Sequence, residues 1–522
     1  MKTRDLIVDA CALLDLQASD PAAAIGEMVA AMEAAGRLKD SARCLADALA
    51  RHRQHRVGIG GGIAIPHALT AGVSQPLLAI GRRPSGLDYQ ATDNQRVTLI
   101  FLLLVPQSAA GLHLKILGRL AHILKMKGAA DLLLQAETPA ESLAFFERCG
   151  QELGEMESPD DLPRVCVAGA GAGGLAMAAH LSLLGCQVNL FNRSPDRIQC
   201  IQDLGGIRVS GEVTGFARIS VVSTDPVEAL RDTDLVMVVV PAVGHREIAM
   251  RLGPHLQDGQ VVVLNPGRTG GALEFAAVLR ETGAPAWPAL AEAQTLLYAC
   301  RDIAPASVRV FCVKNAVPVA ALPAHMTPDV LAVTSKCLPH FVAGDNVLKT
   351  GLGNIGAIFH PALAILNAAW IEERHGDFDY YLEGVSPSVA QVLEALDGER
   401  VAVAAALGIG VPTARQWLYL SYGASGRNLH DAIQANPGYI GIRAPNRLEH
   451  RYLTEDVPMS LVPMASLGEH LGVPVPGLKA FIHLASLLHQ RDYWAEGRTV
   501  DKLGLNGMTV AQIRRVVEEG PL

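Results

Sequence analysis

The sequence predicts an α/β protein with an added all-helical region, arranged as three units. From residue 164 onward, short apolar runs alternate with helical periodicity, which is the pattern of a doubly wound parallel sheet. After about residue 342 the strand patterns stop and helical periodicity continues to the end. The first part mixes strand and helix patterns, and an acidic, proline-bearing stretch separates it from the rest. We therefore predict domains at 1–150, 164–341 and 342–522, with a linker at 151–163.

The composition excludes several classes of protein. The 522 residues carry a formal net charge of −8 and half of them are apolar, which supplies ample buried core and no basic block for nucleic acid. The nine cysteines are scattered without a CxxC pair, which excludes a zinc ribbon or a disulfide framework, and no other metal site is indicated. The first residues lack an apolar signal core, and the longest apolar runs are too short to span a bilayer. We therefore expect a soluble, cytoplasmic protein that binds neither nucleic acid nor membrane.

Each predicted element has a local reason. In the first unit, helical periodicity covers Asp20–Ala34 and Ser41–Ala50, the run VTLIFLLLV at Val97–Val105 indicates a buried strand, and Leu112–Leu124 has the spacing of an amphipathic helix. The strands predicted in the second unit are VCVAGA, QVNLFN, Asp234–Pro241 and Gln260–Asn265.

A glycine-rich turn follows the first strand of the second unit. Gly169, Gly171 and Gly174 stand as G-x-G-x-x-G between a predicted strand and a predicted helix. The first glycine permits a tight turn, the second lets the backbone approach a pyrophosphate, and the third allows close packing of helix on strand. Phosphates then lie at the helix N-terminus, where unpaired N–H groups favour negative charge. In this context the motif predicts a Rossmann-type dinucleotide-binding domain, and a glycine-rich turn without a ligand is the alternative.

The end of the next strand predicts the choice of cofactor. An Asp or Glu about 20 residues after the glycines would bind the ribose hydroxyls of NAD, but this chain has Asn192, Arg193 and Ser194 there. Arg193 has the charge to pair with a 2′-phosphate and the planar group to stack on adenine. The sequence thus favours NADP(H), with NAD(H) as the alternative. A solvated Arg193 without any ribose contact is the competing interpretation.

A histidine in the helical region is a candidate for proton transfer. His360 stands beside Pro361, where we predict that a helix starts, and Asn367 follows seven residues later on the same face. Neutral imidazole exchanges a proton near pH 7 and so suits the protonation that accompanies hydride transfer. A carboxylate would have to orient it, and a later segment offers Glu455 and Asp456. A plain helix-capping role for His360 stays open, because only geometry assigns such roles.

Longer stretches extend this interpretation through the second and third units. They are, in order, GAGAGG, VPAVGH, LNPGRTGG, AEAQTLLYACR, GNIGAIFHP, FDYYLEGVSPSVAQVLEALDGER and RYLTEDVP. On these stretches the chain resembles the octopine/nopaline (opine) dehydrogenase family from Arg164 to the C-terminus. The resemblance implies a reductive condensation, in which a 2-keto acid and the amine of an amino acid form an imine that the nicotinamide reduces to a secondary-amine dicarboxylic acid.

The resemblance also implies roles for individual residues. The histidine of the family's GN…HP motif, here His360, is the proton donor, and the aspartate that orients it corresponds to Asp456. Arg451, in the RYLTED motif, would contact a substrate carboxylate.

Since the product carries two carboxylates, the chain needs more than one cation near the reaction. Arg268 and Arg301 are candidates beside Arg451, and for both an ordinary ion pair is as good an interpretation. Gln294 and Thr295 are weaker candidates for lining the pocket.

The first unit contains a second candidate histidine. The stretch GIGGGIAIPHA ends in His67 after a glycine-rich turn and a short apolar strand. A histidine held in this way could act as a nucleophile toward phosphate, and an ordinary strand-end histidine is the alternative. The motif, with Gly61 where Asn is common, resembles enzyme IIA domains of the fructose–mannitol and nitrogen-regulatory type in the bacterial phosphotransferase system, over about residues 5–148.

That resemblance implies a phosphorylation site. His67 would accept phosphate from a phosphohistidine carrier protein. Arg51, 16 residues before it, and His113, 46 residues after it, match the family's spacing and would support the phosphoryl group. Regulation, rather than sugar transport, is the expected role, because no permease or cysteine-based IIB segment is recognised.

Together these patterns predict an NADP(H)-dependent opine dehydrogenase-like enzyme whose IIA-like domain reports nutrient state. Two alternatives stay open: a simple 2-keto acid reductase without an amine co-substrate, and a phosphorelay signalling protein with an NADP redox-sensing domain. The expected partners are an amino acid, a 2-keto acid and a phosphocarrier protein, and a homodimer is left open.

Overall fold

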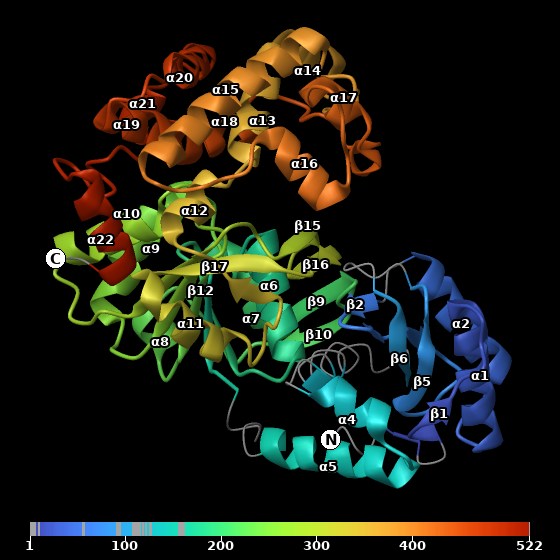
Figure 1. The fold of residues 1–522 in the computed structure, drawn as a ribbon. Coiled ribbons are helices and arrows are strands. Elements are labelled where there is room, and N and C mark those ends of the chain that lie inside the picture. Colours follow the sequence, from blue (N-terminus) through green and yellow to red (C-terminus); the bar gives the residue numbers. More distant parts are fainter. Residues whose placement is uncertain are drawn as a thin grey trace. The chain divides into compact units, whose positions relative to one another are not determined.

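The chain divides into two compact units, residues 1–162 and, apart from two three-residue segments, residues 163–522. Figure 1 follows the elements along the chain. The computed structural model describes residues 7–8, 11–54, 58–89, 95–106, 116, 120, 123–124, 128–154 and 162–520. The predicted boundaries of the three domains stay predictions.

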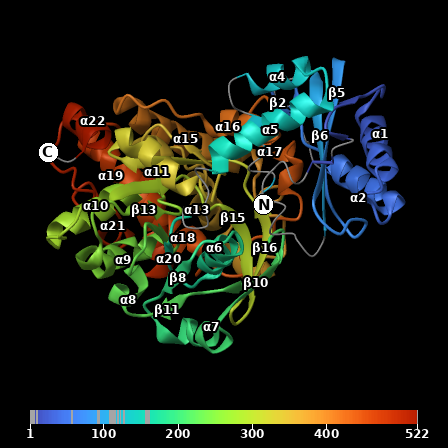
Figure 2. The same ribbon diagram turned by 90° about the horizontal axis from the view of Figure 1, so that it is seen from below.

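The first unit is a sheet with helices on both faces. In order across the sheet, the strands are β1 (Leu14–Asp15), β5 (Leu77–Leu87), β6 (Val97–Pro106), β3 (Ile63–Ala64) and β2 (Gly58–Gly60), and β4 (His67–Thr70) also pairs with β6. The helices described here are α1 (Pro21–Ala34), α2 (Ser41–Gln54), α4 (Ala129–Gln135) and α5 (Pro139–Gly154). Figure 2 shows α1 and α2 on one side of β5 and β6, with α4 and α5 on the other.

Strand β6 explains why this unit has two cores. Alternate side chains of a strand point to opposite faces. Ile100 and Leu102 therefore join the core shared with α1 and α2. Phe101 and Leu103 join a separate core that includes Phe146 of α5. Because both faces are covered, the strand is apolar along almost its whole length.

Most predicted elements of the first unit are present. Helices α1 and α2 and strand β6 confirm the patterns at Asp20–Ala34, Ser41–Ala50 and Val97–Val105. Asp20 caps α1 by accepting the N–H of Ala23, and Pro21 follows it as the first residue of the helix. The predicted helix at Leu112–Leu124 lies largely outside the described residues.

The second unit contains an eight-stranded sheet and a smaller one. The large sheet has the order β11 (Val221–Ser223), β8 (Val188–Phe191), β7 (Val165–Ala168), β12 (Leu235–Val238), β13 (Val261–Leu264), β14 (Ala289–Ala293), β17 (Val317–Leu322) and β18 (Phe341–Ala343). The small sheet has the order β10 (Gly215–Arg218), β9 (Gly206–Gly211), β16 (Ser307–Val313) and β15 (Tyr298–Ala304). From β11 to β14 all neighbours are parallel, which confirms the predicted doubly wound sheet; β17 then runs antiparallel to β14.

Helices cover the large sheet, so its central strands are apolar on both faces. Every residue of β7, β12 and β13 is buried. The helices around the two sheets are α6 (Ala172–Leu183), α7 (Gln199–Leu204), α8 (Pro226–Leu230), α9 (His245–Leu252), α10 (Gly271–Glu281), α11 (Thr327–Thr334) and α12 (Val347–Leu352). The glycine motif, Asn192, Arg268 and Gln294 all follow the carboxyl ends of strands, where such sheets bind ligands.

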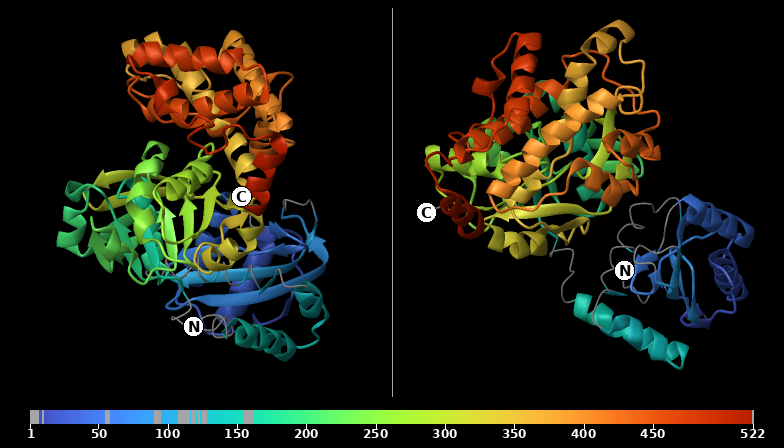
Figure 3. Two further views of the ribbon diagram at one scale, coloured as in Figure 1. Left: turned by 90° about the vertical axis from the view of Figure 1, so that its left-hand side faces the viewer. Right: turned by 45° about the horizontal axis from the view of Figure 1, so that its top comes forward.

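The rest of the second unit is helical, as predicted. Its helices are α13 (Gly356–Leu366), α14 (Ala368–Arg374), α15 (Pro387–Ala406), α16 (Ala414–Tyr422), α17 (Leu429–Gln434), α18 (Arg451–Thr454), α19 (Val462–Leu471), α20 (Pro476–His489), α21 (Tyr493–Glu496) and α22 (Val510–Glu519), with a π-helix at Val457–Leu461. The left view of Figure 3 shows most of them as a bundle to one side of the large sheet. Local signals set their ends: Ser386 caps α15, and Thr413 with Gln416 forms a capping box on α16.

The predicted start of the helix that carries His360 was wrong. Helix α13 begins at Gly356, and Pro361 lies inside it. Proline interrupts a helix because it lacks the N–H that would bind the carbonyl four residues earlier, here that of Ala357. Most of α13 is buried, and this packing outweighs the missing bond.

In the described part of the chain, no single helix has the length and apolar character to cross a membrane. Only the two segments Val347–Leu366 and Ala368–Arg374, bent by 69°, meet that test as a pair, on length and composition alone.

Candidate functional site

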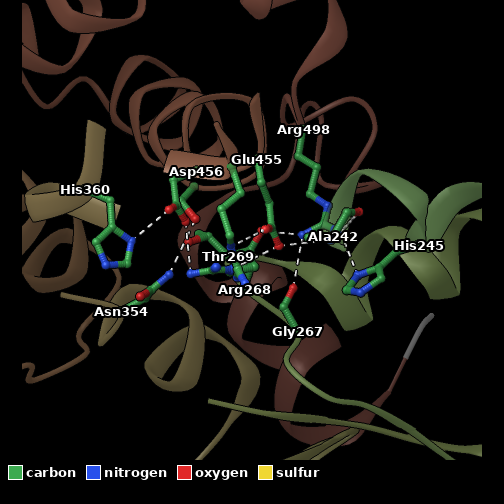
Figure 4. A network of polar contacts seen from close by, with 12 residues as sticks. Ala242, His245, Gly267, Arg268, Thr269, Asn354, His360, Glu455, Asp456 and Arg498 are labelled. Atoms are coloured by element: carbon green, nitrogen blue, oxygen red, sulfur yellow. Dashed lines mark hydrogen bonds and ion pairs between the residues drawn. The ribbon is translucent and has the colours of Figure 1, made fainter. Parts of the chain in front are cut away.

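A histidine and an aspartate from distant segments meet in the second unit. Nδ1 of His360 on α13 lies 2.8 Å from Oδ2 of Asp456, 96 residues later in the chain. Asp456 is fully buried between α18 and the π-helix, whereas the His360 side chain is 21% exposed. A carboxylate on Nδ1 makes that nitrogen the N–H donor, which leaves Nε2 to exchange a proton with a ligand. Figure 4 shows the pair at one end of a longer polar network.

Asp456 is shared between two groups that can carry positive charge. Its second oxygen, Oδ1, lies 2.9 Å from Nη1 of Arg268. Burial alone would raise the pKa of Asp456, but the charges of Arg268 and His360 outweigh it, and the pKa is lowered. The aspartate therefore stays ionised and can stabilise a protonated His360. Arg268 is itself buried, so this ion pair, rather than an exposed substrate contact, is what the structure shows for it.

Glu455 joins the same network and links it to Arg451. Its Oε1 accepts the backbone N–H of Ala242 at 3.1 Å and lies 3.4 Å from Nε of Arg268. Its Oε2 lies 3.2 Å from Nε of Arg451, whose side chain is 55% exposed. Within the described residues this is the one ion pair of Arg451. The terminal nitrogens of Arg451 can therefore bind a carboxylate.

A fully buried arginine holds the turn that carries Arg268. Arg498, between α21 and α22, donates from Nη1 to the carbonyls of Gly267 at 3.1 Å and Thr269 at 3.3 Å. Its Nε pairs with Glu274 at 2.6 Å. Arg268, between those two carbonyls, has a φ of 59°, which a non-glycine residue adopts only where its surroundings hold it. Arg498 provides that support, and no sequence motif identifies it.

The same guanidinium reaches a buried histidine. Nη2 of Arg498 donates to Nδ1 of His245 at 2.8 Å and to the carbonyl of Ala242 at 3.1 Å. Burial and then the charge of Arg498 hold the pKa of His245 well below its usual range. His245 is therefore neutral and acts as an acceptor within the network.

Aromatic side chains fix the ring of His360. Tyr452 stacks on it with ring centres 4.2 Å apart and an angle of 17°. The hydroxyl of Tyr380 donates to the backbone carbonyl of His360 at 2.7 Å. Sequence reasoning named neither tyrosine, although both lie in the stretches FDYYLEG and RYLTED that carry the family resemblance.

Asn367 lies at the C-terminal end of the same helix. Its Nδ2 donates to the carbonyls of Leu363 at 2.9 Å and Gly384 at 3.0 Å. These bonds tie α13 to the segment that contains Tyr380. Asn367 thus braces the helix, and the described contacts do not bring it to the imidazole of His360.

The glycine loop has the shape that a dinucleotide needs. Gly169 has a φ of 125°, and a Cβ there would meet the carbonyl oxygen of Val239 at 2.4 Å. A Cβ on Gly174 would meet the carbonyl oxygen of Gly169 at 1.8 Å, whereas a Cβ on Gly171 would find nothing within 4 Å. The first and third positions therefore require glycine for packing, and the second leaves open space at the start of α6 for a pyrophosphate. Among the described residues, no three His, Cys, Asp or Glu side chains gather as a metal site.

The strand end beside this loop is polar but already engaged. Oδ1 of Asn192 accepts the N–H of Ala170 at 3.1 Å, and its Nδ2 donates to the carbonyl of Ser194 at 2.9 Å. Asn192 therefore braces the glycine loop. The half-exposed Arg193 pairs with Glu247 of α9, a contact that sequence reasoning did not foresee.

The remaining candidates lie on or near the small sheet. Oγ1 of Thr295 accepts a hydrogen bond from Lys314 at 2.7 Å. Arg301 is exposed on β15, directly opposite Arg309 of β16. Like charges in that register repel, so Arg301 adds positive charge to this sheet and does not form a cross-strand ion pair.

The histidine of the first unit has a different partner. Nδ1 of His67, at the start of β4, lies 2.8 Å from the carbonyl oxygen of Ile65. A carbonyl only accepts, so Nδ1 carries the hydrogen and the lone pair of the ring lies on Nε2, the nitrogen able to attack phosphorus. Gly61 has a φ of 62°, which both glycine and asparagine adopt in such a turn.

Arg51 lies toward the same end of the unit as His67. The N–H of Lys39, just before α2, donates to the carbonyl of Gly72, just after β4, so the helix and the strand run in opposite directions. Arg51 near the end of α2 is thereby placed toward the start of β4. His113 lies outside the described residues.

Comparison with known proteins matches both units. Residues 343–489 match the family described as NAD/NADP octopine/nopaline dehydrogenase, alpha-helical domain, and residues 165–267 match ketopantoate reductase PanE/ApbA. Residues 6–149 match the phosphoenolpyruvate-dependent sugar phosphotransferase system, EIIA 2.

Individual relatives agree with these matches. An opine dehydrogenase of Arthrobacter sp. (strain 1C) is 42% identical over 353 residues, which cover 67% of this chain and 98% of that protein. A fructose-specific EIIA component of the phosphotransferase system of Haloferax volcanii is 38% identical over 104 residues, 20% of this chain and 68% of that protein.

Solved structures share the fold of the second unit. Octopine dehydrogenase with NADH and L-arginine has a TM-score of 0.58 and 21% identity, and covers 69% of this chain and 99% of that one. Yersinopine dehydrogenase with NADP+ bound has a TM-score of 0.53 and 16% identity, and covers 69% of this chain and 98% of that one.

Proposed function

Because the chain belongs to the opine dehydrogenase family and carries an EIIA domain of the phosphotransferase system, we propose that it condenses an amino acid with a 2-keto acid and oxidises NADPH to NADP+ in doing so. We further propose that phosphorylation at His67 controls this reaction. The reverse reaction follows the same path backwards. The observation that carries the proposal is the ionised Asp456 between His360 and Arg268.

The chemistry assigns a task to each group. The amine adds to the keto carbon, and the resulting carbinolamine loses water to give an imine. His360 delivers a proton from Nε2 to the departing hydroxyl, and Asp456 stabilises the imidazole while it is charged. The loss of water leaves the imine protonated on nitrogen, so the hydride that the nicotinamide would supply when bound reduces it directly to the neutral secondary amine. Arg451 holds a substrate carboxylate, which fixes the reacting carbon in place.

The direct experiment is NADPH oxidation by the purified full chain with pyruvate or 2-oxoglutarate, each with and without a panel of amino acids. We expect oxidation that depends on the amine and a secondary-amine dicarboxylic acid as product, detected by mass spectrometry. No oxidation with any keto acid, with or without amines, would contradict the proposal.

A simple 2-keto acid reductase is the second candidate. The match of residues 165–267 to ketopantoate reductase favours it, because that stretch alone does not require an amine. An oxidation rate indifferent to the amine would establish this alternative. The variant His360→Ala distinguishes an enzyme from a redox sensor without catalysis. In an enzyme it should abolish turnover while leaving NADPH affinity unchanged.

We propose NADP(H) as the preferred cofactor. Support comes from the absence of an acidic residue at 192–194, where NAD-binding chains carry one, and from the guanidinium of Arg193. The ion pair between Glu247 and Arg193 counts against this preference, because the carboxylate competes with a 2′-phosphate for the guanidinium. A ratio of kcat/KM for NADPH over NADH above one would support the proposal, and a ratio below one would contradict it.

Phosphorylation at His67 is the regulatory half of the proposal. The tautomer set by Ile65 supports Nε2 as the acceptor, and Arg51 would hold the phosphoryl oxygens. A cytoplasmic location belongs to this proposal, because the chain must meet both NADPH and a phosphocarrier protein. We expect a phosphate-dependent gel shift with the carrier protein that His67→Ala abolishes, together with a change in the rate of NADPH oxidation. Phosphorylation of His67 without any change in the rate of NADPH oxidation would contradict the proposal that phosphorylation regulates the enzyme.

A further inference from the structure

A partly buried lysine of the second unit lies close to the site. Lys314 directly follows β16, and its Nζ donates to Oγ1 of Thr295. Among the described residues it forms no ion pair with a carboxylate, and the side chains of Cys312 and Arg268 lie close enough to act on its charge. Burial lowers the pKa of Lys314, Cys312 opposes this shift, and the charge of Arg268 adds to it. A cation held in this way is stabilised by any anion that binds beside it.

The threonine that accepts from this lysine lies between the two halves of the site. The residue before it, Gln294, donates from Nε2 to the carbonyl of Gly353, in the turn that leads into the helix of His360. The residue after it, Leu296, lies against Gly173, which is at the start of α6 beside the glycine loop. A Cβ on Gly173 would lie 3.3 Å from the Leu296 side chain. A substrate that takes hydride on one side and a proton on the other must occupy the space between these two halves.

The two side chains offer suitable donors for a carboxylate. The ammonium of Lys314 has three hydrogens, of which Thr295 takes one. The hydroxyl of Thr295 accepts from the lysine and keeps its own hydrogen to donate. Two donors side by side match the two oxygens of a carboxylate, and the positive charge strengthens both bonds.

We propose that Lys314 and Thr295 bind a substrate carboxylate, in addition to the one held by Arg451. The inference rests on the proposed function, in which two carboxylic acids are joined and two carboxylates enter one site. Arg268 cannot fill this role, because Asp456 and Glu455 already neutralise it. The carboxylate belongs either to the 2-keto acid or to the amino acid, and binding measurements tell the two apart.

The test measures binding without turnover. The full chain, saturated with NADP+, is titrated in a calorimeter with pyruvate, 2-oxoglutarate or one of the amino acids, each alone. No opine can form under these conditions, because only one substrate and the oxidised cofactor are present. Lys314→Met removes the charge at nearly constant length, Lys314→Arg keeps it, and Thr295→Val removes the hydroxyl. Lys479→Met on α20, where the lysine pairs with Glu469 at the surface, is the matched control.

We expect Lys314→Met to raise the dissociation constant of one substrate class at least tenfold, with Lys314→Arg recovering most of the loss and Thr295→Val giving a smaller loss. A loss for keto acids assigns their carboxylate to this site, and a loss for amino acids assigns theirs. Unchanged binding of both classes would overturn the inference, as would a loss confined to NADP+ affinity. If the wild type binds both acids but gives no amine-dependent oxidation, the proposed function fails while the carboxylate site stands.

Discussion

The two candidate histidines differ in the partner of the same ring nitrogen. Nδ1 of His67 faces the neutral carbonyl of Ile65, and Nδ1 of His360 faces the ionised carboxylate of Asp456, each at 2.8 Å. A carbonyl orients the ring by accepting its N–H and adds no counter-charge, which suits a nucleophile. A carboxylate also stabilises the protonated ring, which suits a proton donor. The partner's charge thus fits each histidine to the separate chemistry that we propose for it.

The largest expected effect comes from removing that charge. Asp456→Asn leaves an oxygen near Nδ1 of His360 but makes the partner neutral, like that of His67. We expect kcat for amine-dependent NADPH oxidation to fall by about 10³ to 10⁴, because a protonated His360 loses its counter-ion. NADPH affinity, measured by fluorescence titration, should not change.

A matched control exists among the buried aspartates. Asp397 pairs with the fully buried Arg400 at 2.7 Å, within the helical region. Asp397→Asn should lower the melting temperature and leave kcat within about twofold of the wild type, since only the charge at Asp456 touches the reacting ring. Equal losses of kcat in both variants would show that the effect of Asp456→Asn is structural.

A second prediction compares Asp456 with another buried carboxylate. Glu292 accepts the N–H of Ala272 and the hydroxyl of Thr350, and burial outweighs these bonds and the charge of Arg498 and raises its pKa to about 7. The folded state therefore holds this proton more tightly than the unfolded chain does. Its contribution to the free energy of unfolding is present below about pH 4.5 and is lost as the pH rises through about 7, by about 3 kcal/mol in total.

Glu292→Gln checks this sign. Urea unfolding at pH 5 and at pH 8 should show that the wild type loses more stability than the variant over this range, by about 2 to 3 kcal/mol. Parallel losses in both proteins would mean that Glu292 is ionised in the folded state throughout.

A third prediction separates a buried arginine that supports the site from one that only stabilises the fold. Arg498→Lys removes the fork that holds the carbonyls on both sides of Arg268. We expect kcat/KM to fall about tenfold, which corresponds to about 1.4 kcal/mol. Arg400→Lys should lower the melting temperature about as much as Arg498→Lys does, but its kcat/KM should stay close to that of the wild type. A loss of stability alone in both variants would remove the supporting role of Arg498.

The smallest effect is expected at the cofactor's ribose. Glu247→Gln releases Arg193 from its exposed ion pair, which is itself worth at most about 1 kcal/mol. NADPH should bind about threefold more tightly, with little change for NADH. Tighter binding of both nucleotides by the same factor would mean that Arg193 does not meet the 2′-phosphate.

Local patterns were enough to predict most of the fold. The apolar runs of β6, β7, β12 and β13 lie at the predicted places because strands covered on both faces need apolar residues throughout. The glycine motif gave the dinucleotide loop for an equally local reason, since a Cβ at Gly169 or Gly174 would collide with backbone. The antiparallel direction of β17 and the start of α13 were not predicted, because both depend on how distant segments pack.

By itself the sequence determined the order of the units and the glycine loop and singled out the two candidate histidines, because period, turn chemistry and motif are properties of neighbouring residues. Only the tertiary structure decided the partners: Arg268 turns to Asp456 instead of to solvent, Asn367 braces its own helix, and Arg498 supports a turn 231 residues earlier in the chain. Such contacts form where packing excludes water, and a buried charge then selects the nearest group that can neutralise it.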